Sequence, residues 1–101
     1  DDILQVGDLV LNRTCREVSR AGIKIQLRRK EYDILEYLVV NKNRPVSRAM
    51  ILDHAWSDDR ENWNNTVDVH IKQLRDKVDR PFSYPLIKTA YGIGYVVDDE
   101  T

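Results

Sequence analysis

The chain has 101 residues, 42% of them hydrophobic and 33% charged, which suits one globular domain with a single core. No apolar run approaches the roughly 18 residues that a membrane-spanning helix needs, and the acidic start, Asp1–Leu4, lacks the features of a signal peptide. A single cysteine, Cys15, excludes an internal disulfide and favours a reducing cytoplasm as the expected location.

The net charge is −1, which by itself argues against a nucleic-acid partner. The charges are unevenly distributed along the chain, however. Segments 28–56 and 65–92 each carry two more basic than acidic residues, whereas 57–64 and 93–101 carry an acidic excess. This distribution is compatible with a local DNA-facing patch but does not demonstrate one.

The N-terminal quarter of the chain has the pattern of short strands. Leu9–Leu11 is rich in β-prone residues, Arg16–Arg20 surrounds an apolar centre, and Ile23–Leu27 alternates apolar and polar side chains. Turns are expected at Asn12–Thr14 and at 21–22. These segments predict a small antiparallel sheet with one buried face.

The apolar spacing then changes to that of a helix. The repeated apolar residues are Ile34, Leu35, Leu38 and Val39. This spacing predicts a helix over about 29–42, which Asn43-Arg44-Pro45 stops. Ser47 is a suitable N-cap for a second helix over about 48–56, in which Trp56 is expected in the core.

A third helix is predicted over 65–79, and Pro81 ends it. Four apolar residues spaced 4, 3 and 4 form one core-facing stripe: Val67, Ile71, Leu74 and Val78. The opposite face holds Asn65, Val69, Lys72, Gln73, Asp76 and Arg80. The strand-like segments Leu86–Thr89 and Tyr95–Val97 follow, and their short glycine-containing connector predicts a hairpin.

The order of elements is strands, three helices and a hairpin, with a polar loop at 57–64. A helix pair joined by a loop and followed by a hairpin is the layout of a winged helix-turn-helix. The expected fold is therefore α+β, a winged helix-turn-helix with an N-terminal antiparallel β-sheet, three helices and a C-terminal β-hairpin wing. Residues 1–101 are expected to form this one domain.

Two segments resemble the effector domains of the OmpR/PhoB family of response regulators. Residues 65–78, NTVDVHIKQLRDKV, are similar to the family's recognition helix. Residues 86–95, LIKTAYGIGY, match the I-x-T-x-x-G-x-G-Y pattern of its wing. Further matches are Leu27 with Glu31, Pro45–Arg48 and Trp56. The resemblance thus covers essentially the whole chain.

The resemblance implies sequence-specific binding of double-stranded DNA by the output domain of a two-component response regulator that controls transcription. It places residues 65–79 in the major groove and residues 86–97 on the backbone or in the minor groove. The implied partners are promoter DNA with direct repeats, a second copy in a dimer on DNA, RNA polymerase, and a sensor kinase that phosphorylates a receiver domain absent from this chain. A bacterial cytoplasmic location is implied, with no membrane partner, cofactor or metal.

Side chains on the outer face of the 65–79 helix are the candidates for reading bases. Gln73 can pair bidentately with adenine, and Asn65 can do likewise if it reaches. Val69 can pack on a thymine methyl group, and Lys72 either reads guanine or neutralises a phosphate. Without the resemblance, Lys72 and Gln73 would be interpreted as an ordinary solvated face.

Phosphate contacts, which fix the register of a protein on DNA, are expected from a larger set. Its members are Thr66, His70, Arg75, Lys77, Lys88 and Thr89. DNA contact is also expected from Arg48, and from Tyr91 and Gly92 at the wing tip. Arg75 has an alternative role in a salt bridge to a carboxylate, and Tyr91 either packs across the wing turn or touches DNA. The resemblance assigns the polymerase contact to Asp58, Asp59, Arg60, Glu61 and Trp63.

Catalysis and metal binding find little support. His54 and His70 lack the spacing of a zinc site. The acidic residues at 53–61 lack the calcium-loop spacing and its central glycine, and Gly92–Gly94 is too short for a phosphate-binding fingerprint. The chain is therefore not expected to be an enzyme. The alternative is a winged helix used for protein–protein contact, which salt-sensitive, sequence-dependent DNA binding would exclude.

Overall fold

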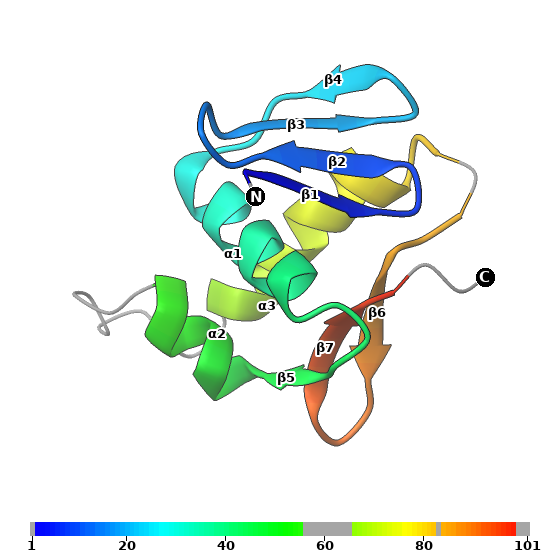
Figure 1. Ribbon diagram of the computed structural model, residues 1–101. Coiled ribbons are helices and arrows are strands. Elements are labelled where there is room, and N and C mark those ends of the chain that lie inside the picture. Colours follow the sequence, from blue (N-terminus) through cyan, green and yellow to red (C-terminus); the bar gives the residue numbers. More distant parts are fainter. Residues whose placement is uncertain (1, 56–65, 83, 99–101) are drawn as a thin grey trace.

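A computed structural model describes residues 2–55, 66–82 and 84–98 (Figure 1). A four-stranded sheet covers one side of the helices, and a β-hairpin projects at the opposite side. This is the α+β winged-helix arrangement that the sequence predicts. The expected loop at 57–64 and the expected core position of Trp56 lie outside the described residues.

The N-terminal sheet has four antiparallel strands in chain order: β1 (Ile3–Val6), β2 (Leu9–Asn12), β3 (Glu17–Arg20) and β4 (Ile23–Ile25). The last three correspond to the strands that the sequence predicts. The sequence pattern does not predict β1, because Ile3 is 50% exposed while Val6 is buried. Apolar side chains therefore occupy both faces of β1 and mask its alternation.

Two turns of this sheet form where the sequence predicts them. Ala21 and Gly22 have φ angles of 54° and 80°. Positive φ at both central residues is the type I′ geometry that suits a tight hairpin. After β2, the side-chain oxygen of Asn12 accepts the backbone N–H groups of Thr14 (3.1 Å) and Cys15 (3.4 Å). Both turns therefore follow from local chemistry.

The first two helices begin where their cap residues indicate. α1 spans Arg29–Val40, two residues shorter than predicted, and the Glu31 carboxylate accepts a backbone N–H at its start (2.9 Å). α2 spans Arg48–Ala55. Ser47 Oγ accepts the N–H of Met50 at 3.1 Å, which confirms Ser47 as the N-cap of α2.

α3 spans Thr66–Leu74 and continues into a π-helical segment, Arg75–Asp79. The N–H of Arg80 donates to the carbonyl five residues earlier at 2.9 Å, which is the hydrogen bond of a π-helix. The prediction of one continuous α-helix is therefore wrong at this end. Two successive residues, Val78 and Asp79, are buried here. The buried Asp79 carboxylate pairs there with Arg20 of β3 at 3.0 Å.

The wing is the hairpin of β6 (Ile87–Ala90) and β7 (Gly94–Val97), close to the segments that the sequence predicts. A short strand that the sequence does not predict, β5 (Val46–Ser47), pairs with β7 and gives the sheet order β5-β7-β6. Glycine is required at position 94, because a Cβ there would lie 2.1 Å from the carbonyl oxygen of Val46.

The hydrophobic core joins both sheets and all three helices. It includes the apolar stripe of α3 and of the π-helical segment after it, whose members are each at most 3% exposed: Val67, Ile71, Leu74 and Val78. The predicted core-facing stripe is thereby confirmed. With this face of α3 fixed in the core, the remaining side chains of the helix are directed outward.

Candidate nucleic-acid interface

The outer face of α3 carries the residues expected to read bases. Val69 is 48% exposed, Lys72 is exposed and Gln73 is half-buried. Because the apolar stripe anchors the opposite face in the core, the helix cannot turn these side chains inward without unpacking. Asn65 and the side chain of Thr66 lie outside what the structure describes.

An ion-pair cluster joins α3 to the start of α2 and to the wing. Asp68 Oδ1 accepts hydrogen bonds from the Tyr95 hydroxyl group and from Arg48 Nε (2.8 Å). The Arg48 Cζ also lies 5.3 Å from the centroid of the Tyr95 ring. The bonds from Tyr95 and Arg48 lower the pKa of Asp68, so the carboxylate stays ionised at neutral pH. Arg48, a predicted DNA contact, thus already has an anionic partner.

Arg75, the first residue of the π-helical segment after α3, holds the wing through hydrogen bonds. Its Nε donates to the Ile87 carbonyl (3.3 Å) and its Nη2 to Thr89 Oγ1 (2.7 Å), both on β6. Its Cζ lies 5.5 Å from the centroid of the Tyr95 ring. These hydrogen-bond acceptors are a carbonyl and a hydroxyl group rather than the carboxylate of the alternative interpretation. Contact with phosphate stays a prediction for Arg75 and Thr89.

Two of the predicted lysines have acidic partners. Lys77 Nζ donates to Glu31 Oε1 at 2.7 Å, and Lys88 Nζ donates to Asp98. Burial raises the pKa of Glu31, but the hydrogen bonds from Lys77 and from the backbone outweigh this effect and lower the pKa overall. Phosphate contact by Lys77, Lys88 and the half-buried His70 stays a prediction.

The tip of the wing protrudes from the domain. Tyr91 is 91% exposed, so its side chain does not pack across the turn. Gly92 follows with a φ of 82°, the left-handed conformation that favours glycine. Ile93, beside it, is 54% exposed. The tip therefore presents apolar side chains without positive charge, and DNA contact by Tyr91 and Gly92 stays a prediction.

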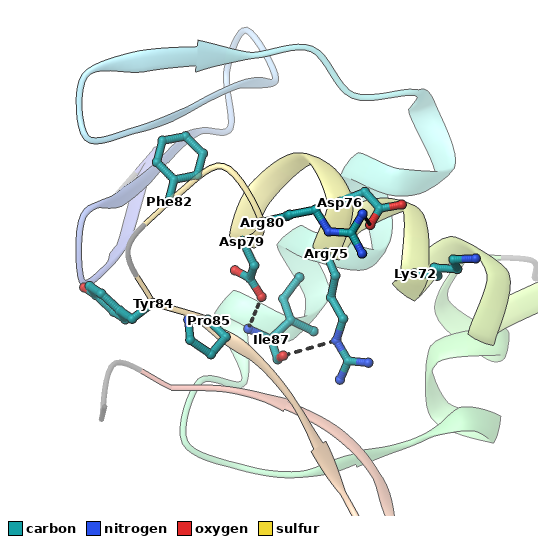
Figure 2. Close-up of a pocket in the computed structure, with 9 residues that line it drawn as sticks. All are labelled: Lys72, Arg75, Asp76, Asp79, Arg80, Phe82, Tyr84, Pro85 and Ile87. Carbon is teal, nitrogen blue, oxygen red and sulfur yellow. Dashed lines mark hydrogen bonds and ion pairs between the residues drawn. The ribbon is translucent and has the colours of Figure 1, made fainter.

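A cavity of about 430 Å³ lies beside the end of α3, next to the start of β6 (Figure 2). It is lined by Lys72, Arg75, Asp76, Asp79, Arg80, Phe82, Tyr84, Pro85 and Ile87. Arg80 pairs with Asp76 at 3.6 Å, one helical turn away, while Arg75 reaches toward Ile87. The sequence pattern gives no sign of this cavity, because its walls come from segments that meet only in the fold.

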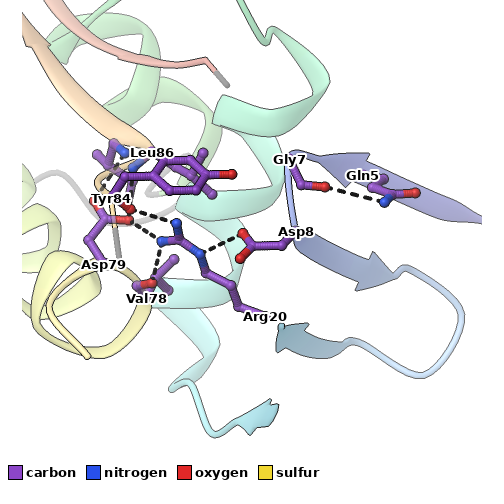
Figure 3. A network of polar contacts seen from close by, with 9 residues as sticks. Gln5, Gly7, Asp8, Arg20, Val78, Asp79, Tyr84 and Leu86 are labelled. Carbon is purple, nitrogen blue, oxygen red and sulfur yellow. Dashed lines mark hydrogen bonds and ion pairs between the residues drawn. The ribbon is translucent and has the colours of Figure 1, made fainter. Parts of the chain in front are cut away.

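A buried arginine connects the N-terminal sheet to the π-helical segment after α3 and, through Asp79, to the start of the wing (Figure 3). Arg20, on β3, is 0% exposed. It donates to Asp8 Oδ1 (2.8 Å), the Val78 carbonyl (2.8 Å), Asp79 Oδ1 (3.0 Å) and the Tyr84 carbonyl. The Asp79 carboxylate also accepts two backbone N–H groups at the start of β6, and burial raises its pKa. The network thus sets where the wing begins.

The sequence interpretation does not single out Arg20 or Asp68, although both organise the interface. A signal for Arg20 exists, because it lies two residues after Val18 and both therefore face the same, buried side of β3. Asp68 carries a weaker signal, as an acidic residue on a helix interpreted as facing DNA. Its partners, Arg48 and Tyr95, lie far from it in the sequence.

Within the described residues, no helix combines the length and the apolar composition that crossing a membrane requires. Across the same three ranges, no group of three or more His, Cys, Asp or Glu side chains gathers where it could hold a metal ion. The described surface instead offers the outer face of α3 and the protruding wing.

Comparison with known proteins gives consistent matches. The family described as "Transcriptional regulatory protein, C terminal" matches residues 22–97. Transcriptional regulatory protein TrcR of Mycobacterium tuberculosis is 41% identical over 97 residues, which cover 96% of this chain and 37% of TrcR. The structure of DrrB, an OmpR/PhoB homolog of Thermotoga maritima, has a TM-score of 0.83 and 32% identity, covering 97% of this chain and 45% of DrrB. The DNA binding domain of CpxR from E. coli has a TM-score of 0.83 and 29% identity, covering 99% of this chain and 100% of that one.

Proposed function

Since the chain belongs to the C-terminal domain family of OmpR/PhoB-type transcriptional regulators, we propose that it binds double-stranded promoter DNA in a sequence-dependent manner. Domains of this family are the DNA-binding output domains of two-component response regulators and are not enzymes. The CpxR structure is described as a DNA binding domain, and its fold is shared by this chain along almost the whole length.

The outward face of α3 is the observation that carries the proposal. An α-helix fits the major groove, where base edges display a readable pattern of donors and acceptors. Gln73 offers the amide pair that suits adenine, Val69 offers an apolar surface for a thymine methyl group, and Lys72 offers a cation for guanine or phosphate. We assign a second amide contact to Asn65.

Phosphate contacts hold such a domain in register. We assign them to Arg48, Thr66, His70, Arg75, Lys77, Lys88 and Thr89, with Tyr91 and Gly92 at the wing tip. An ammonium group has three donors and a guanidinium group has five, so an internal hydrogen bond leaves others for DNA. Internal bonds also orient the side chain in advance, which reduces the entropy lost on binding.

The role of the whole protein is a wider proposal, because the chain spans 37% of TrcR and 45% of DrrB. We propose a bacterial cytoplasmic response regulator whose receiver domain, outside this chain, is phosphorylated by a sensor kinase. Dimers would then bind direct repeats in promoters.

Segment 57–64, outside the described residues, is proposed to contact RNA polymerase. The assigned residues are Asp58, Asp59, Arg60, Glu61 and Trp63. Trp63→Ala in the full-length regulator should lower transcription activation in a reporter assay and spare DNA affinity. A matching loss of DNA affinity would contradict the assignment.

The proposed DNA binding is tested by selecting the purified domain against a random duplex library. Anisotropy titration of the selected duplex over a salt series then measures its affinity. We expect a repeated motif with half-sites about one helical turn apart, and an affinity that falls steeply as salt rises. Binding without sequence preference would contradict base reading by α3. No binding even at low salt would favour a winged helix that contacts proteins.

Gln73→Ala tests the base contact directly. It should relax the sequence preference at one position and cost roughly 1–3 kcal/mol there. Gln26→Ala is the matched control, because Gln26 is exposed beyond β4 and outside the proposed interface. An unchanged preference profile for Gln73→Ala would remove this residue from the readout.

A further inference from the structure

An acidic side chain lies on the surface proposed to face DNA. Asp68 is the one acidic residue in α3, and its side chain is 47% exposed. A carboxylate close to phosphates weakens binding through like-charge repulsion unless a cation offsets it. The hydrogen-bond partners of Asp68 indicate how this carboxylate favours DNA binding despite its charge.

Asp68 Oδ1 is the meeting point of three elements. It accepts the Nε–H of Arg48, the first residue of α2 (2.8 Å), and the hydroxyl group of Tyr95, on β7. The guanidinium group of Arg48 lies over the same Tyr95 ring, with Cζ 5.3 Å from the centroid. One oxygen atom thus links the helix proposed for the major groove, the helix before it, and the wing.

We propose that Asp68 is a positioning residue, which orients Arg48 toward a DNA phosphate and fixes the wing strand relative to α3. The inference rests on the proposed function, because it requires that α3 faces DNA. Arg48 is bound to Asp68 through Nε, so a phosphate can be bound bidentately through Nη1 and Nη2. An arginine whose stem is already restrained loses less side-chain entropy when it binds.

The opposite role for the same contact is competition, in which the carboxylate occupies the guanidinium group and withholds it from DNA. Both side chains are about half exposed, 55% for Arg48 and 47% for Asp68. An exposed ion pair of this kind is weak, so it can orient a side chain without preventing an additional bond to phosphate. Tyr95 supplies the geometric constraint, because its hydroxyl group holds the carboxylate from the wing.

Asp68→Asn is the decisive variant, because it keeps the shape of the side chain and removes its charge. Asp76→Asn is the matched control, since it removes an equal charge from the helical segment that directly follows α3. Asp76 pairs with Arg80, at 3.6 Å, rather than with Arg48. Both are titrated by anisotropy against the selected duplex over a salt series. Wild type, Arg48→Ala and the double variant of Arg48→Ala with Asp68→Asn are titrated alongside.

We expect Asp68→Asn to bind about tenfold more weakly than wild type, although its change in charge favours DNA. Its salt slope should fall by about one, because one phosphate contact is lost. Asp76→Asn should bind at least as tightly as wild type. Arg48→Ala should reproduce the loss, and the double variant should add little to it, since both substitutions act through one contact.

Equal or tighter binding by Asp68→Asn, with an unchanged or steeper salt slope, would overturn positioning and establish competition. Wild type that shows no sequence-dependent binding would instead refute the proposed function, so the two failures are distinguishable. Thermal unfolding shows whether each variant folds. If Asp68→Asn does not, Tyr95→Phe keeps the ring, removes one hydrogen bond and should weaken binding in the same direction; unchanged affinity would then overturn the inference.

Discussion

The prediction with the largest expected effect concerns Arg20, which is fully buried between the N-terminal sheet and the π-helical segment after α3. Its guanidinium group bonds to Asp8 (2.8 Å), to the Val78 carbonyl (2.8 Å) and to Asp79 (3.0 Å). Methionine has a similar length and no charge, so Arg20→Met removes these bonds with little change in shape. Asp79 would then remain as a buried carboxylate without its cation.

The size of the effect follows from the partners that remain. Removing one member of a buried ion pair costs about 3–5 kcal/mol. Asp79 keeps the backbone N–H groups of Leu86 (3.0 Å) and Ile87 (3.1 Å), so the lower end, about 3 kcal/mol, is expected. A domain of this size loses roughly 4–8 °C per kcal/mol, so the Tm should fall by about 12–24 °C.

Urea unfolding and thermal scans followed by circular dichroism measure both quantities. Arg13→Met is the matched control, because Arg13 forms an exposed ion pair with Glu36 (3.1 Å) that contributes little. The dependence on pH gives an independent check. Burial raises the pKa of Asp79, so stability linked to its neutral form is present at low pH and lost as pH rises. The difference in unfolding free energy between Arg20→Met and wild type should therefore become smaller in acid.

An unfolding free energy for Arg20→Met within about 0.5 kcal/mol of wild type would refute the reasoning, because such small effects are typical of surface substitutions. If the difference in unfolding free energy between Arg20→Met and wild type stays constant as acid protonates Asp79, the unpaired charge of Asp79 is not its cause. The cost would then come from the lost bonds to the Val78 and Tyr84 carbonyls.

Three further predictions concern a helix contact, the wing sheet and the wing tip. Burial raises the pKa of Glu31 but the bond from Lys77 lowers it overall, so stability from this pair is present above the ordinary glutamate pKa and is lost as pH falls through the lowered pKa of Glu31. Urea midpoints of Glu31→Gln should then decline less in acid than those of wild type, and parallel curves would contradict this. Gly94→Ala places Cβ 2.1 Å from the Val46 carbonyl oxygen and should lower the unfolding free energy by about 1–3 kcal/mol. An unchanged unfolding free energy would exclude this close approach. Tyr91→Arg should leave the Tm unchanged, because residue 91 is 91% exposed. It should raise the salt slope of DNA binding by about one, because it adds a cation to the wing tip. An unchanged salt slope would place the tip away from phosphates.

Local chemistry explains the parts of the fold that sequence predicts correctly. Ser47 caps α2 through the N–H of Met50, three residues later. Ala21 and Gly22 form their turn within a single hairpin. The apolar stripe of α3 repeats within each helical turn. In all these cases the determining residues are close neighbours in the chain, so a short sequence window contains the whole cause.

Distant contacts explain the parts that sequence does not predict. β5 has two residues, Val46 and Ser47, and exists because β7 pairs with it from the far end of the chain. The π-helical segment buries Asp79 beside Val78, where Arg20 from β3 meets both. No short window around these residues contains their partners, so their pattern alone does not indicate the structure.

The candidate interface likewise has features that the sequence predicts and others that depend on distant contacts. The sequence proposes its cations, but it does not show that Arg48, Arg75, Lys77 and Lys88 each bond to another part of the domain. From sequence, such residues are indistinguishable from cations that face solvent, because their partners lie on other elements. Their internal bonds become visible only when the helices are packed against one another and against the wing.

Hydrogen bonds from three residues hold the wing to α3 and to the π-helical segment that follows it. Asp68 bonds to Tyr95, Arg75 to Thr89, and Asp79 to the backbone at the start of β6. A helix and a wing that are fixed to each other lose little conformational entropy when they engage DNA together. Three of the proposed phosphate ligands, Arg48, Lys77 and Lys88, are oriented by acidic partners within the domain.

This arrangement reconciles the net charge of −1 with a DNA partner. The salt dependence of binding follows the number of phosphates that are neutralised, not the total charge of the protein. Acidic residues such as Asp68, Glu31 and Asp98 lower the net charge, yet each holds a lysine or arginine in a defined place. A near-neutral domain can therefore present a small, ordered set of cations, and this order favours specific over non-specific binding, which depends on charge alone.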